Sequence, residues 1–261
     1  MSDMLHLCAK DKKEKISIFR NLFKGREDVF AKYWVSRKTE KKGYSPVCKN
    51  EWIPQICRKP CEKCGNKDYV PLDDFWIEKH LKGEVTIGIY PIQLDDRVNF
   101  LVFDFDKENW FGDAKQLIKF CQGIDLPTYL ERSRSGNGGH LWIFFSQSVS
   151  AAKVREFGFT LLEKAGIAGI SGDKSGFDRI FPNQDFLQER GLGNLIALPL
   201  QYHARQKIKV FAVLQGKTIR EYVLESIRER LDRESEEKQL LAMTTQINPV
   251  LKEIWNNKKD D

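Results

Sequence analysis

The sequence predicts an α+β fold with a cysteine-stapled segment in its N-terminal part. Three observations lead to this prediction. Apolar residues recur with helical spacing in several segments, and short β-branched and aromatic runs alternate with those segments. Residues 38–70 show no sustained period but contain four cysteines. With 261 residues, 41% of them hydrophobic, the chain is long enough to form a substantial core.

The N-terminal third is predicted to be helical around an irregular insertion. Apolar side chains at helical spacing predict a helix over residues 11–23, and residues 73–82 predict a second one that ends near Gly83. The intervening segment 38–70 is too long for a plain loop inside a compact domain, so something other than a hydrophobic core must hold it.

The remaining elements alternate between strands and helices. Helices are predicted for residues 113–122 and 150–165, and a long charged helix for residues 218–243. The predicted strands are residues 85–90, 98–106, 128–132, 141–145, 195–200 and 208–214. The chain is therefore divided into an N-terminal region with the insertion at about residues 44–70, a core, and a charged C-terminal helix: 1–84, 85–216 and 217–261.

The charge balance is compatible with a polyanionic partner. The net charge is +6, and Lys and Arg are concentrated between residues 10 and 67. No run approaches the roughly 18 apolar residues that would span a membrane. The first 15 residues lack the apolar stretch of a secretory signal, so a cytoplasmic protein without a membrane segment is expected.

Asp104 and Asp106 end the apolar run of residues 98–106. Because side chains alternate between the faces of a strand, these two share a face, about 7 Å apart along the strand. Carboxylates so placed repel each other unless a cation neutralises them, and Mg²⁺ or Mn²⁺ suits oxygen ligands. A pair of such ions can activate a 3′-hydroxyl and stabilise a leaving pyrophosphate. The pattern also fits glycosyltransferases, phosphatases, or merely the polar end of a strand.

The glycine-rich segment before His140 is the second candidate for function. It contains three glycines in four positions, so that backbone N–H groups can converge on an anion, and the flanking serines and arginines add donors. A tight hairpin followed by a structural histidine is the alternative interpretation. The order of a carboxylate strand, a helix, a strand, a glycine-rich turn and a histidine favours the functional one.

This succession resembles the archaeo-eukaryotic primase superfamily, whose core has an acid-x-acid motif, a small-residue turn leading to a histidine, and a third acid after an apolar residue. The third motif corresponds to Phe177-Asp178. Four strings are particularly similar to the primase-polymerase domains of conflict-system and CRISPR-associated proteins. They are FKGR at 23–26, YSPVC at 44–48, FDRIFPNQ at 177–184 and GNLIALPL at 193–200. The resemblance covers about residues 15–215.

The resemblance implies a catalytic core built from an RRM-like antiparallel sheet module and a second α/β module, with flanking helices. It implies that Asp178 is the third metal ligand, with Asp185 as its rival, and that His140 lies against the triphosphate of an incoming nucleotide. Further candidate contacts to the nucleotide are Ser135, Asn137, Arg134, Gln184 and Asn194.

The cysteine cluster has the pattern C-x8-C-x3-C-x2-C and consists of Cys48, Cys57, Cys61 and Cys64. Its final Cys-x-x-Cys-Gly knuckle is typical of structural zinc, and four thiolates make a closed tetrahedral site. An iron–sulfur cluster is the alternative, and His80 is a less favoured substitute ligand. With Trp52, Lys59 and Lys63 nearby, we hypothesise that this insertion touches the template.

Together these features predict a DNA primase-polymerase that uses Mg²⁺ or Mn²⁺ and carries a structural Zn²⁺. Its partners would be a single-stranded DNA or RNA template, nucleoside triphosphates and, by family analogy, CRISPR adaptation or other defence-system proteins. The alternatives from other classes are a non-catalytic zinc-containing nucleic-acid-binding module and a metal-dependent nuclease.

Overall fold

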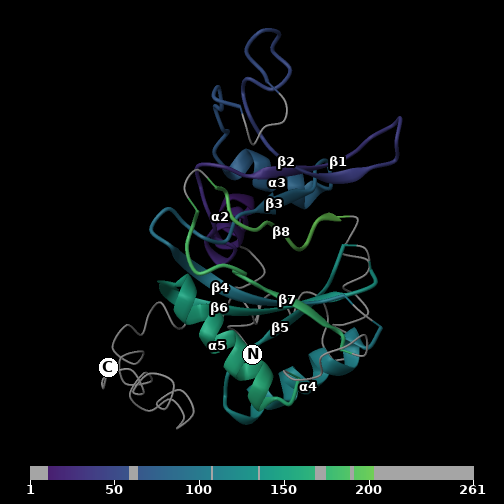
Figure 1. Cartoon of the computed structure of the whole chain (residues 1–261), viewed down its shortest axis with the longest axis vertical. Helices are drawn as coiled ribbons and strands as arrows, with labels where there is room; N and C mark the ends of the chain where they lie inside the picture. The colour runs from purple at the N-terminus through teal and green to yellow at the C-terminus, as the bar shows by residue number, and fades with distance from the viewer. Residues whose placement is uncertain are drawn as a thin grey trace.

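The computed structural model describes residues 11–58, 64–106, 108–134, 136–167, 175–188 and 191–202. Within these ranges the chain forms two four-stranded antiparallel sheets, which lie one above the other in Figure 1. The predicted strand at 208–214 and the charged helix at 218–243 lie outside the described residues. In the described part of the chain, no helix is long and apolar enough to cross a membrane.

The upper sheet has the strand order β2-β1-β3-β8 and takes its strands from three distant parts of the sequence. These strands are β1 (Ala31–Val35), β2 (Lys42–Pro46), β3 (Ile87–Ile89) and β8 (Ile196–Ala197). Two helices accompany this sheet, α2 (Lys12–Leu22) and α3 (Asp74–Lys82). The predicted regions 1–84 and 85–216 thus contribute strands to the same sheet, since β1 pairs with β3.

Both of these helices begin at aspartate caps. Asp11 accepts a hydrogen bond from the backbone N–H of Glu14 at 2.7 Å, and Asp73 accepts one from that of Trp76 at 3.1 Å. Gly83 ends α3 in the left-handed conformation, with a φ of 87°, as predicted.

The lower module has the chain order βαββαβ and the spatial order β5-β6-β4-β7. Its elements are β4 (Arg97–Phe105), α4 (Trp110–Gly123), β5 (Tyr129–Arg132), β6 (Gly139–Ser150), α5 (Ala151–Lys164) and β7 (Phe177–Phe181). This is the ferredoxin-like arrangement, in which the first and third strands are central. The predicted α+β class and RRM-like sheet module are confirmed.

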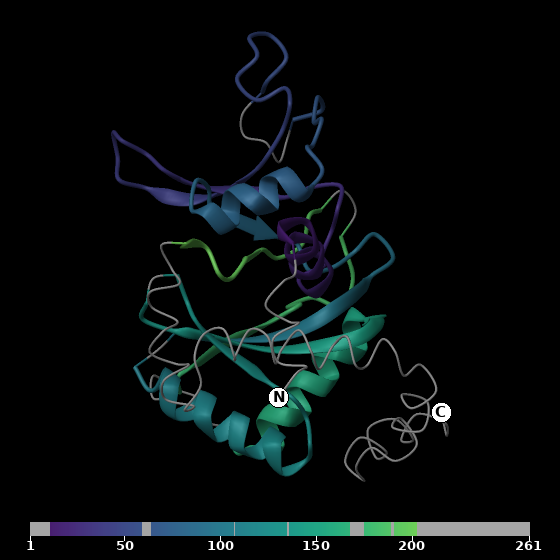
Figure 2. The ribbon, with the colours of Figure 1, turned by 180° about the vertical axis from the view of Figure 1, so that it is seen from behind.

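Strand β4 is buried on both faces. Leu101, Phe103 and Phe105 pack against α4 and α5, which lie beneath the lower sheet. Phe100 and Val102 point the other way, into a cluster between the two sheets. We call this second cluster the shared core because both sheets and the helices α2 and α3 contribute to it. Figure 2 shows α2 between the two sheets from the opposite side.

His80 is a structural residue of the upper module. Its buried ring accepts the backbone N–H of Ile87 at Nδ1, 3.1 Å away, and Nε2 lies 2.9 Å from the carbonyl oxygen of Pro199. These partners assign the proton to Nε2, which donates to that carbonyl. His80 thereby fastens α3 to β3 and to the segment after β8, and it is not placed as a ligand for zinc.

The cysteine-rich insertion is closed at its base by backbone pairing. Cys48 and Tyr69 form an antiparallel bridge, and the N–H of Lys49 donates to the carbonyl of Asp68 at 2.8 Å. Cys48, Cys57 and Cys64 are free thiols, while Cys61 lies outside the described residues. Backbone hydrogen bonds, of which the one from Arg58 has the largest effect, lower the pKa of the Cys64 thiol. The zinc site stays a prediction.

Candidate active site

Four polar side chains lie side by side across the lower sheet, one from each strand. The strand register pairs Glu131 of β5 with His140 of β6, His140 with Asp104 of β4, and Asp104 with Arg179 of β7. Residues paired in this way project from the same face of a sheet. We call these four residues the polar row. It lies on the face that carries Phe100 and Val102, which is the face toward the upper sheet.

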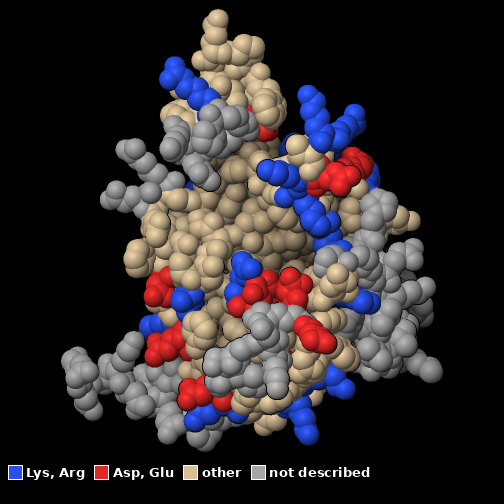
Figure 3. Space-filling model, turned by 45° about the vertical axis from the view of Figure 1, so that its right-hand side comes forward, with Lys and Arg blue, Asp and Glu red and all other residues tan. Residues whose placement is uncertain are grey.

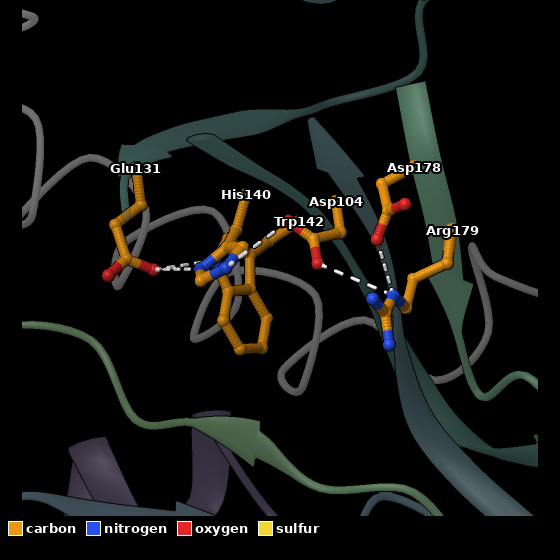
Figure 4. Close-up of polar contacts among 6 residues, drawn as sticks. All are labelled: Asp104, Glu131, His140, Trp142, Asp178 and Arg179. Atoms are coloured by element: carbon orange, nitrogen blue, oxygen red, sulfur yellow. Dashed lines mark hydrogen bonds and ion pairs between the residues drawn. The ribbon is translucent and has the colours of Figure 1, made fainter. Parts of the chain in front are cut away.

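Asp104 is the centre of the polar row. Its Oδ1 lies 3.7 Å from Nε2 of His140 and its Oδ2 lies 3.8 Å from Nε of Arg179 (Figure 4). The side chain is only 17% exposed. Burial raises the pKa of Asp104, and the neighbouring Asp178 and Asp106 act in the same direction against His140 and Arg179. An additional cation would therefore stabilise the ionised form of this carboxylate.

A β-bulge brings Asp178 to the same site. Arg179 pairs with Asp104 and Phe177 pairs with Phe105, so Asp178 is an extra residue with no partner in the register. A bulge lets two consecutive side chains project toward one face. Figure 4 shows Asp178 and Arg179 both directed toward Asp104, with Arg179 Nε 2.6 Å from Asp178 Oδ2.

Asp185 lies elsewhere. Its Oδ1 accepts a hydrogen bond at 2.6 Å from Nε of Arg155 on α5. Asp178 and Asp185 are the two candidates for the third acid. The structure places Asp178 beside Asp104, whereas Asp185 is bound to Arg155 of α5.

Asp106 follows the end of β4 and lies against the glycine-rich turn. Its exposed side chain acts electrostatically on both Asp104 and His140. A Cβ on Gly138 would lie 2.8 Å from Asp106 Oδ1 and 2.3 Å from the carbonyl oxygen of Phe105. Only glycine permits this close approach of the turn to the acids.

Glu131 holds the other side of His140. Its Oε2 accepts a hydrogen bond from Nε1 of Trp142 at 3.0 Å and lies 3.4 Å from Nδ1 of His140. Burial lowers the pKa of His140, but hydrogen bonding to Glu131 and the charges of Glu131, Asp104 and Asp106 outweigh it, so the pKa is raised. The imidazole therefore carries a proton on Nδ1 toward Glu131 and presents Nε2 to Asp104.

The sequence interpretation missed Glu131 and Arg179. Both belong to the polar row only through pairing between strands. Arg179 stands in the motif FDRIFPNQ, but that motif indicated only Asp178 and Gln184 as site residues. Glu131 stands in no motif. The predicted pair of strands on either side of the glycine-rich turn could have revealed Glu131. Counting outward from the glycine-rich turn places Glu131 opposite His140.

The other predicted nucleotide contacts are dispersed. The Arg134 guanidinium lies over the ring of Tyr33 in β1, 3.9 Å from its centroid, and Asn137 is exposed on the turn. Gln184 lies three residues beyond Phe181, which pairs with Val102, and it donates to the carbonyl of Phe186. Asn194 is half-buried just before β8, and Ser135 lies outside the described residues.

A family model identifies the kind of domain that contains both sheets. The family described as "TOTE conflict system, Archaeo-Eukaryotic Primase domain" matches residues 14–229. The chain belongs to this family. The match covers both sheets of the archaeo-eukaryotic primase domain and the whole polar row. The comparison with curated proteins gave no match.

Among solved structures, one similar to this primase domain is the polymerase domain of Ligase D from Mycobacterium tuberculosis in complex with DNA. The identity is 15% and the TM-score 0.40, over 74% of this chain and 77% of that chain.

The acidic side chains at the polar row are of the chemical type that binds divalent cations. Asp104, Asp106 and Asp178 offer hard oxygen donors, which Mg²⁺ and Mn²⁺ prefer. Within the described ranges, however, no three His, Cys, Asp or Glu residues are grouped closely enough to hold a metal ion. Arg179 lies between Asp104 and Asp178 and supplies positive charge there. A cation held by both acids would require this guanidinium to move away.

Proposed function

We propose that the chain is a primase-polymerase, an enzyme that joins nucleoside triphosphates to a 3′-hydroxyl under the direction of a nucleic-acid template. The observation that carries this proposal is the convergence of Asp104, Asp178 and His140 on one face of the sheet of an archaeo-eukaryotic primase domain. Asp106 and the glycine-rich turn lie at the edge of this face.

Asp104, Asp106 and Asp178 would hold Mg²⁺ or Mn²⁺. When bound, such ions lower the pKa of an attacking hydroxyl and stabilise the charge on departing phosphates. The burial that raises the pKa of Asp104 supports this role, because a cation relieves the cost of a buried anion. Arg179 would leave the acids and face the negative charge of the nucleotide instead.

His140 would contact the triphosphate. Glu131 favours its protonated form, and a protonated imidazole donates to a phosphate oxygen without competing for the metal. The exposed Asn137 and the glycine-rich turn with Ser135 and Arg134 would add donors. Gln184 would reach the nucleotide only after the segment that follows β7 rearranges.

The proposal is tested by extension of a labelled primer on a single-stranded template with Mg²⁺ or Mn²⁺. We expect product from wild type with deoxynucleotides or ribonucleotides, and loss of more than about 100-fold in Asp104→Asn, Asp106→Asn and Asp178→Asn. Asp185→Asn is the matched control, because it removes the same charge from the acid paired with Arg155, and should retain activity.

The outcomes separate the alternatives. Shortening of the template without extension would identify a metal-dependent nuclease, and binding without either product would leave a non-catalytic binding module. Loss of activity in Asp185→Asn with activity kept in Asp178→Asn would reverse the assignment of the third acid.

We also propose that Cys48, Cys57, Cys61 and Cys64 bind one structural Zn²⁺. Atomic absorption should give about one zinc per chain and less in Cys61→Ser. Iron together with visible absorbance would identify a cluster instead. Association with CRISPR adaptation or other defence proteins is proposed by family analogy alone.

A further inference from the structure

The β1–β2 hairpin projects from the body of the molecule and ends in a basic tip (Figure 1). Four of the seven residues 36–42 are Lys or Arg and one is Glu. We define the basic tip as Arg37, Lys38, Lys41 and Lys42. All four are exposed, and none forms an ion pair with another residue in the described part of the chain. In Figure 3, Lys and Arg side chains gather where this hairpin projects, above a group of acidic side chains.

Trp34 next to the basic tip is held in one orientation. It pairs across the hairpin with Gly43, and a Cβ on that glycine would lie 3.1 Å from the indole ring. The indole Nε1 donates to Oγ of Ser45 at 2.8 Å. The ring therefore lies across Gly43, yet it is 42% exposed. A fixed aromatic ring with one face toward solvent is a ready surface for stacking a base.

The aromatic surface continues onto α3. The Lys32 ammonium lies 5.1 Å from the centroid of the Trp76 ring, and that of Lys79 lies 4.7 Å from the ring of Phe75. Phe75 is exposed like Trp34. Rings and cations thus alternate along one side of the upper module, as they do on surfaces that bind single strands.

The opposite face of the hairpin is connected to the candidate active site. Tyr33 points away from Trp34 because strand side chains alternate. Its ring carries the guanidinium of Arg134, which belongs to the same turn as Gly138, and Gly138 lies against Asp106. One face of the hairpin therefore carries the exposed aromatic surface, and the other face contacts Arg134 of the turn that lies against Asp106.

We propose that this hairpin binds a single strand of nucleic acid, with a base stacked on Trp34 and phosphates on the basic tip. The inference rests on the proposed function in that the bound strand would be the template. It differs from our hypothesis for the cysteine-rich insertion, whose exposed Trp52 is the rival contact. Stacking favours a strand with unpaired bases over an acidic peptide, because a peptide offers charge without bases for the ring.

The test measures fluorescence anisotropy of labelled oligo(dT) and oligo(U) with the full chain, without added Mg²⁺, Mn²⁺ or nucleotides, across a series of salt concentrations. Trp34→Ala should weaken binding about 5- to 100-fold with an unchanged salt slope, and Trp34→Phe should recover most of the affinity. The double variant Lys38→Ala/Lys41→Ala should lower the slope of log K against log salt by about 1.4.

The matched control is Lys119→Ala/Lys164→Ala, which removes the same charge from exposed positions of α4 and α5. It should leave the slope of log K against log salt equal to that of wild type within error. Unchanged binding in the hairpin variants, loss confined to Trp52→Ala, or no binding by wild type would each overturn the inference. If the chain extends primers normally but the hairpin variants bind single strands like wild type, the inference about the hairpin is refuted and the proposed function stands. If binding depends on the hairpin but no primer is extended, only the proposed function is refuted.

Discussion

Replacing Glu131 tests the electrostatics of the polar row. The Glu131 side chain is 12% exposed and serves two donors, Nε1 of Trp142 and Nδ1 of His140. Glu131→Ala leaves the indole N–H without an acceptor, and Trp142 is only 2% exposed. An unsatisfied buried donor costs about 1–3 kcal/mol, and loss of a hydrogen bond to a charged group costs about 1.5–3 kcal/mol. Because the contact to His140 is long, we expect roughly 3 kcal/mol in total near pH 6.

Glu131→Gln separates the two contributions. The amide oxygen still accepts from Trp142, so the loss is confined to His140 and should be about 1–2 kcal/mol near pH 6. The folded-state pKa of His140 is raised above its ordinary 6.5, mainly because Glu131 outweighs the effect of burial. Its stabilising contribution is therefore fully present below pH 6.5 and is lost as the pH rises through the folded-state pKa. The cost of Glu131→Gln should accordingly shrink between pH 6 and pH 9.

The assay is urea unfolding followed by circular dichroism at the two pH values, without added Mg²⁺ or Mn²⁺. Glu163→Gln, which neutralises an exposed glutamate on α5, is the control and should show a small effect independent of pH. An equal cost of Glu131→Gln at both pH values, or a larger one at pH 9, would refute the coupling between Glu131 and His140.

Three further substitutions address the acids and the core. Arg179→Gln should bind Mn²⁺ roughly tenfold more tightly without nucleotide, by calorimetry, because a positive charge beside Asp104 is removed; weaker binding would contradict this. Gly138→Ala should keep the fold by circular dichroism but lower extension by about 100-fold, since the added Cβ forces the turn away from Asp106; full activity would show that the close approach is unimportant. Leu117→Ala, in the fully buried core under the sheet, should cost about 2–5 kcal/mol in urea unfolding, and a cost below 1 kcal/mol would mean that this core collapses around the gap.

Periodicity predicted the elements whose faces differ clearly in polarity. The helices α2, α3, α4 and α5 and the strand β4 all have a continuous apolar side, and each was predicted within a few residues. Strand alternation likewise places Leu101, Phe103 and Phe105 on the face opposite Asp104, where they pack in the core. These are local properties, so a single sequence carries them.

Three strands, β1, β2 and β7, escaped prediction for physical reasons. β1 has the sequence AKYWV, in which Tyr33, Trp34 and Val35 follow one another without an apolar–polar alternation. β2 is an edge strand with the sequence KGYSP, whose residues are half-exposed and lack an apolar alternation. β7 contains the bulge at Asp178, which breaks the two-residue period that identifies a strand. The same bulge is what turns Asp178 toward Asp104, so the feature that hides the strand also forms the site.

Which residues form the site depends on the register in which the strands pair, and the sequence specifies that register only weakly. Asp104 and His140 stood out by their motifs, but Glu131 and Arg179 join them only because four strands align at one level. Their contribution follows from long-range pairing that no local pattern specifies.

The shared core limits how the two sheets can move relative to each other. Asp104 lies two residues beyond Val102, whose side chain is fully buried between the sheets with Phe100. A hinge motion that parted the sheets would expose several such side chains, each at a cost of about 1.5–3 kcal/mol. The shared core therefore opposes any separation of the two sheets, and it holds the polar row of the lower sheet at a fixed place beneath the upper one.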